Sequence, residues 1–148
     1  MRAIPHSDLA LLSKKELHSL ADGLIGGYQD SIDHCVEFVA NESKGIWHGR
    51  GRAMMCRRLK HCALTAAQKT QLLEAILERF VGGGFSEQFK DQLRLAMHLN
   101  WEVTLAAAHK ALKSHKNHVV RYAQWVLPHE VLNAPSAIAN PGCARTTP

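Results

Sequence analysis

The sequence predicts an all-α fold, and three features of it support this prediction. Apolar residues recur at intervals of three and four along most of the chain, the spacing of one face of an α-helix. Two Ser or Thr residues are followed three positions later by Glu or Gln, which is the pattern of a helix capping box. The hydrophobic fraction is 46% and the charged fraction 21%, values typical of a chain that folds around a core.

The first helical segment covers residues 13–43. Ser13 and Glu16 form its capping box, and apolar residues then follow one face as far as Val39. The pair Gly26-Gly27 interrupts this face, and each glycine weakens a helix by roughly 1 kcal/mol relative to alanine. We therefore expect one long helix with a kink, or two collinear pieces.

The later helices are placed by start and stop signals. Thr65 and Gln68 form the second capping box, Ser86 and Asn100 are good N-cap residues, and Pro128 ends the last helix. The expected helices cover 49–62, 65–81, 86–99, 100–112 and 117–127.

These helices form pairs over about 13–62, 65–99 and 101–127. The length fits one domain, which we place at residues 1–128. Residues 129–148 are rich in Pro and Ala and lack helical periodicity, which predicts a flexible tail.

The stretch "ALKSHKNHVVRYAQWVL", residues 111–127, resembles a HEAT repeat. In that family the first helix of a pair ends in Ala-Leu, and the second begins with Val and Arg and continues with a buried Ala and a final Leu. The matching residues here are Ala111, Leu112, Val119, Arg121, Ala123 and Leu127. The resemblance covers about half of the chain and implies antiparallel helix pairs stacked as a short α-solenoid. A compact helical bundle of the same helices is the alternative.

Three consecutive glycines, Gly82 to Gly84, precede Ser86, and they have two interpretations. Backbone N–H groups at a helix start can bind phosphate, but nucleotide-binding loops of this kind follow a strand and carry a lysine or a further glycine at fixed spacing. Here a helix precedes the loop and no lysine lies within it. We expect a turn, with Gly82 as the helix-ending residue at positive φ.

Ten histidines and four cysteines raise the question of a metal site or a nucleophile. The paired Cys-x2-Cys spacing of structural zinc sites is absent, so we expect no metal, no cofactor and no catalytic residue. Cys35 and Cys62 are expected in the core. Cys56, next to Arg57 and Arg58, would have a lowered thiol pKa if exposed, but we expect it to be partly buried.

Charge is distributed unevenly along the chain. Residues 1–43 carry seven acids and three Lys or Arg, whereas residues 44–62 carry six Lys or Arg and no acid. Residues 103–129 also lack acids. Either the basic segments form a surface for an anionic partner, or the acidic first segment packs against a basic neighbour and the charges offset one another.

The candidate residues for binding an anionic partner are the basic ones of these segments and one arginine between them. In a stack of helix pairs the second helices lie side by side, so Arg57, Arg94 and Arg121 are expected in one stripe suited to phosphates. Trp47 and Trp125 would add stacking to exposed bases, although we expect both in the core. The full candidate set is Arg50, Arg52, Arg57, Arg58, Lys60, Arg94, Lys113, Lys116 and Arg121.

The leading hypothesis is a non-catalytic helical binding module whose basic face contacts an acidic protein surface or nucleic acid. Two alternatives are a small enzyme with a pocket at the turn from Gly82 to Ser86, and a structural or assembly subunit, with homo-oligomers a possibility. No signal peptide or membrane-length apolar run is found in the sequence, so we expect a cytoplasmic protein with no membrane contact.

Overall fold

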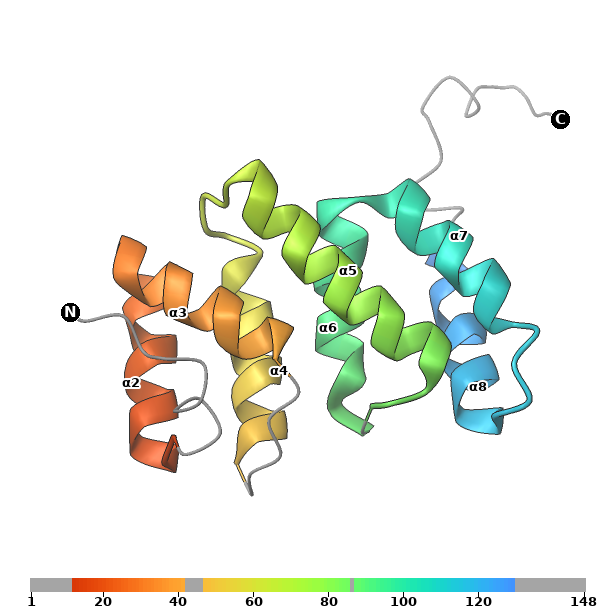
Figure 1. Cartoon of the computed structure of the whole chain (residues 1–148), viewed down its shortest axis with the longest axis horizontal. Helices are drawn as coiled ribbons and strands as arrows, with labels where there is room; N and C mark the ends of the chain where they lie inside the picture. The colour runs from red at the N-terminus through yellow and green to blue at the C-terminus, as the bar shows by residue number, and fades with distance from the viewer. Residues whose placement is uncertain (1–11, 42–46, 86, 130–148) are drawn as a thin grey trace, which may run out of the picture.

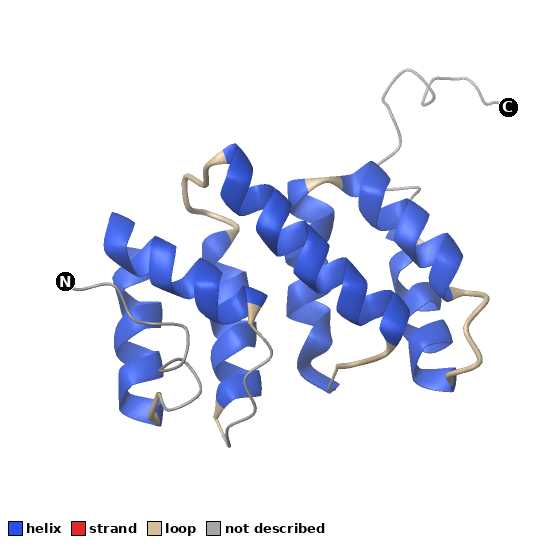
Figure 2. Cartoon of the chain, viewed as in Figure 1, coloured by secondary structure: helices blue, strands red, loops and turns tan. Residues whose placement is uncertain are grey.

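The computed structural model describes residues 12–41, 47–85 and 87–129 (Figure 1). These ranges contain seven α-helices, one short 3₁₀ helix and no strand (Figure 2). The all-α prediction is therefore confirmed. Ser86, Cys143 and almost all of the predicted tail lie outside the described residues.

The helices form two layers (Figure 1). In one layer α2, α4, α6 and α8 run in the same direction, and α2 contacts α4, which contacts α6. The other layer runs the opposite way, with α3 against α5 and α5 against α7. The helices are α2 (Lys14–Ile25), α3 (Gln29–Ala40), α4 (His48–Leu59), α5 (Ala66–Gly82), α6 (Lys90–Leu99), α7 (Trp101–Ala111) and α8 (Asn117–Val126), with the 3₁₀ helix η1 (Glu87–Phe89) before α6.

Both predicted capping boxes are present. The Ser13 amide donates to Glu16 Oε1 at 3.0 Å, and the Glu16 amide donates to Ser13 Oγ at 3.2 Å. Thr65 and Gln68 make the same reciprocal pair at 3.1 Å in both directions. Asn100 caps α7, since its side chain accepts the N–H three residues further on. Local sequence therefore fixes the starts of α2, α5 and α7.

The prediction for residues 13–43 is wrong in one respect, because the two pieces are not collinear. Helix α2 ends before Gly26-Gly27, Gly27 has φ +70°, and α3 folds back to contact α2. Gly23 allows the close approach, because a Cβ at this position would lie 2.7 Å from the Ser31 Cβ. The glycine pair is thus a reversal between two packed helices.

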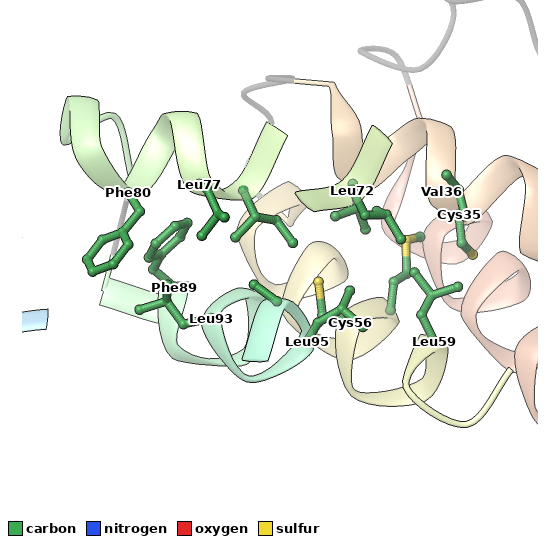
Figure 3. Close-up of a cluster of buried hydrophobic side chains, with 14 of the residues drawn as sticks. Cys35, Val36, Cys56, Leu59, Leu72, Leu77, Phe80, Phe89, Leu93 and Leu95 are labelled. Atoms are coloured by element: carbon green, nitrogen blue, oxygen red, sulfur yellow. The ribbon is translucent and has the colours of Figure 1, made fainter. Parts of the chain in front are cut away.

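The core is continuous between the two layers. Figure 3 shows its side chains running from α3 and α4, represented by Val36 and Leu59, to α5 and α6, represented by Phe80 and Leu93. All four of these side chains are at most 1% exposed. No helix in the described ranges is both long enough and apolar enough to cross a membrane.

Two cysteines belong to this core. Cys35 and Cys56 are fully buried, while Cys62 is half-buried at its edge. Burial raises the pKa of the Cys35 thiol to about 12, against a small opposing effect of Arg58. Burial likewise raises the pKa of Cys56, so the neighbouring arginines do not activate this thiol.

This burial predicts selective thiol chemistry. Iodoacetamide at about pH 8, near the pKa of an exposed thiol, is expected to modify Cys62 in the native protein well before Cys35 or Cys56, as read by peptide mass spectrometry. Unfolding in urea should equalise the three rates. Equal labelling rates of the three cysteines in the native protein would contradict the burial.

Because the folded Cys35 pKa lies above that of the unfolded chain, this protonated thiol contributes its full stability below about pH 8.5 and loses it as pH rises towards 12.

Candidate functional site

The three-glycine loop is a helix-ending turn. Gly83 has φ +80°, and the N–H groups of Gly83 and Gly84 both donate to the Arg79 carbonyl, at 2.8 and 3.2 Å. Two of the amides that an anion cradle would need are thus already bonded. The prediction of positive φ at Gly82 is wrong by one residue, because α5 continues through Gly82 before the reversal.

Two basic side chains bind the carbonyl groups of this turn. Lys116 Nζ donates to the Gly82 carbonyl at 2.8 Å, and His118 Nε2 lies 3.0 Å from the Gly83 carbonyl oxygen. Carbonyls at a helix C-terminus carry partial negative charge, which these groups offset. Lys116, a predicted partner-binding residue, is therefore engaged in holding α8 against the end of α5. Among the described residues no group of three or more His, Cys, Asp or Glu is arranged to hold a metal ion.

Two predicted arginines meet at one carboxylate. Arg57 of α4 and Arg94 of α6 lie 2.7 and 3.2 Å from the two Asp91 oxygens. Both arginine side chains are about half exposed, at 56% and 49%, while Asp91 is 15% exposed. One negative charge held between two guanidinium groups leaves this point of the surface positive.

Two other predicted residues, Arg58 and Arg52, contact neighbouring helices. Arg58 makes an ion pair with Asp22 of α2 at 3.1 Å, so acidic and basic segments do offset one another at this contact. The Arg52 guanidinium lies 5.6 Å from the centre of the buried Phe38 ring. Lys60 is half-buried at the end of α4, and Lys113 is exposed in the turn between α7 and α8.

Trp47 forms one wall of a pocket between α2 and α4. Its side chain is 37% exposed, so the prediction that Trp47 lies in the core is wrong. Lys14 Nζ lies 4.1 Å from the indole ring centre, and the Arg50 guanidinium lies 5.7 Å from it. The pocket has a volume of about 280 Å³ and is lined by Lys14, Leu17, His18, Trp47, Arg50, Gly51 and Met54.

Trp125 is surrounded in a similar way. It is half-buried at the edge of the core on α8, and two cations from α6 lie over its ring. The distances to the ring centre are 5.4 Å for Lys90 Nζ and 5.2 Å for the Arg94 guanidinium. Arg121 is exposed one helical turn before Trp125 and forms no hydrogen bond or ion pair within the described part of the chain.

These contacts connect into one surface, which we call the cationic face. Helical spacing places Trp47, Arg50 and Arg57 on the same side of α4. Arg57 reaches α6 through Asp91, and Arg94 reaches α8 through Trp125. The face consists of Lys14, Trp47, Arg50, Arg57, Lys90, Arg94, Arg121 and Trp125, from four helices of one layer.

Sequence reasoning missed Lys14 and Lys90 because both lie outside the segments rich in basic residues. The signal available was spacing, since Lys90 lies four residues before Arg94 and Arg121 lies four before Trp125. The predicted stripe of Arg57, Arg94 and Arg121 lies within the cationic face. Comparison with known proteins gives no assignment: no family model, no curated protein and no solved structure matches the chain.

Proposed function

We propose that the protein is a non-catalytic binding module and that the cationic face binds an anionic partner. The observation that carries this proposal is the row of cations across α2, α4, α6 and α8, which is linked by contacts around Trp47, Asp91 and Trp125 and by helical spacing along α4 and α8. The two-layer order of the helices supports a HEAT-like stack, an architecture that presents extended binding surfaces.

The charges of the face are available to a partner because several of its cationic side chains are exposed. The Arg57 side chain is 56% exposed, so an incoming phosphate or carboxylate can contact its guanidinium group while the pair with Asp91 stays in place. Arg50 and Arg121 are exposed and make no ion pair within the described residues. Both classes of partner, an acidic protein surface and a nucleic acid, would gain from this field.

Charge reversal tests the proposal. The double variant Arg50→Glu/Arg121→Glu is expected to weaken binding to heparin or to an oligonucleotide at least about tenfold, because each reversal removes one favourable contact and adds a repulsive one. The measurement is a titration by fluorescence anisotropy at two salt concentrations.

The matched control reverses the same amount of charge on the other layer. Lys69 of α5 and Lys110 of α7 are exposed, and Lys69→Glu/Lys110→Glu changes net charge equally. This control should retain binding within about twofold of the wild type, since only distant, screened charge has changed. Equal losses in the two variants would mean that net charge, and no particular face, drives binding.

A further inference from the structure

We propose that the anionic partner is a single-stranded nucleic acid, whose bases stack on Trp47 and Trp125 while the cations between them bind its phosphates. This inference rests on the proposed function and specifies its ligand. The juxtaposition that carries it is two tryptophans on one cationic face, each with two cations within 6 Å of its ring centre.

The Trp47 pocket has the shape and chemistry of a base-stacking site. Its volume, about 280 Å³, lies just below the range of roughly 300–1,000 Å³ typical of small-molecule sites, which suits one planar ring system. Leu17, Gly51 and Met54 supply an apolar lining beside the indole. The pocket also includes Lys14 and Arg50, whose charges match the phosphate attached to a bound nucleotide.

The cation over each ring does not prevent stacking. A cation over an exposed aromatic ring is worth about 2- to 5-fold in an equilibrium constant. A base stacked on an aromatic side chain is worth about 5- to 150-fold. A base therefore displaces Lys14 from the Trp47 ring with a net gain, and the released ammonium group remains close enough to contact a phosphate.

The aromatic components of the face favour nucleic acid over an acidic protein and single strands over duplexes. Carboxylates of an acidic protein would satisfy the cations but would offer no planar ring to the indole of Trp47, which is 37% exposed, or to that of Trp125, which is partly exposed. In a duplex the base faces are already stacked on one another, so only phosphates are accessible to such a surface. A flexible single strand presents bases and phosphates together, and stacking of this kind tolerates any sequence.

The experiment compares two fluorescently labelled probes with wild-type protein. One probe is oligothymidylate of about 15 nucleotides, near the upper end of single-strand site sizes, and the other is an abasic strand with the same number of phosphates. Anisotropy titrations are expected to show about tenfold tighter binding of oligothymidylate, because only this probe can stack. Equal affinities would overturn the stacking inference while leaving the proposed function intact.

Variants of the tryptophans complete the test. Trp47→Leu and Trp125→Leu are expected to lose affinity for oligothymidylate but not for the abasic strand, whereas Trp47→Phe should keep most of the difference. Trp47 is exposed, so Trp47→Leu should retain the wild-type helical circular dichroism. Tighter binding of polyglutamate or of a duplex would also overturn the inference. Failure to bind either strand, heparin or polyglutamate at low salt would overturn the proposed function itself.

Discussion

Replacing Phe89 by alanine is expected to lower the free energy of unfolding by about 3–5 kcal/mol, the usual cost of removing a buried aromatic ring. Phe89 is 1% exposed and lies where α5, the turn and α8 meet. Its ring centre is 4.2 Å from that of Phe85 in a stacked arrangement and 6.2 Å from those of Phe80 and Tyr122. The lost energy includes both apolar burial and these ring contacts.

Urea unfolding followed by circular dichroism measures this effect. Since a domain is stable by only about 5–15 kcal/mol, Phe89→Leu provides a milder variant, with an expected loss of about 1–2 kcal/mol. Tyr28→Ala is the matched aromatic control, because Tyr28 is 68% exposed and should cost under about 0.5 kcal/mol. Similar losses for Phe89→Ala and Tyr28→Ala would contradict the packing described for Phe89.

The helices that the sequence predicted best are those whose ends are specified by neighbouring residues. Ser13 and Thr65 form capping boxes with residues three positions later, an interaction within one helical turn. Such contacts are visible in a single sequence because both partners lie in the same short window. The starts of α2, α5 and α7 were therefore predictable without any tertiary information, whereas α6 begins at Lys90, after η1, and not at the expected residue 86.

The reversal at Gly26-Gly27 was not predictable in the same way. A glycine pair permits either a kink or a full reversal, and the choice depends on what α3 packs against afterwards. Here α3 packs against α2, with Ser31 close to Gly23. The hydrophobic periodicity of each helix does not show which other helix it will contact. The same applies to the one-residue difference between Gly82 and Gly83, which depends on where Lys116 and Val119 approach the turn.

The candidate site likewise has features that the sequence could predict and features that depend on contacts between helices. The expected side-by-side packing of second helices led to the prediction that Arg57, Arg94 and Arg121 lie in one stripe. The contacts that Arg58, Arg52 and Lys116 make within the fold come from other helices, and spacing along one helix does not show them. A single sequence shows which residues are charged but not which groups they contact, so it did not separate Arg58, Arg52 and Lys116 from the other basic candidates. The exposure of Trp47 was likewise not predictable, because a large apolar side chain at a helix start is expected in the core unless the positions of the neighbouring helices are known.

A substitution in the turn at the end of α5 is expected to have the second large effect on stability. Gly83→Ala is expected to lower the free energy of unfolding by about 2–5 kcal/mol. Part of this loss, about 1–2 kcal/mol, is the cost of placing an L-residue at positive φ. The rest is steric, about 1–3 kcal/mol by analogy with overpacked cores, because a Cβ at Gly83 would lie 2.8 Å from Lys116 Cδ and 3.0 Å from Val119 Cγ2.

Gly84→Ala is the control that distinguishes a specific requirement for glycine at position 83 from a general sensitivity of the loop to substitution. A Cβ at Gly84 meets no atom within 4 Å, and the residue does not have positive φ, so the change should cost less than about 0.5 kcal/mol. Lys116 can move its flexible end away from an alanine at 83, but Val119 is fully buried and branched at Cβ, so α8 itself must shift. Gly83→Ala should therefore also change the near-ultraviolet circular dichroism of the Phe85 and Tyr122 cluster, which Gly84→Ala should leave intact. Equal stability of the two variants would show that the turn does not require the left-handed conformation at Gly83.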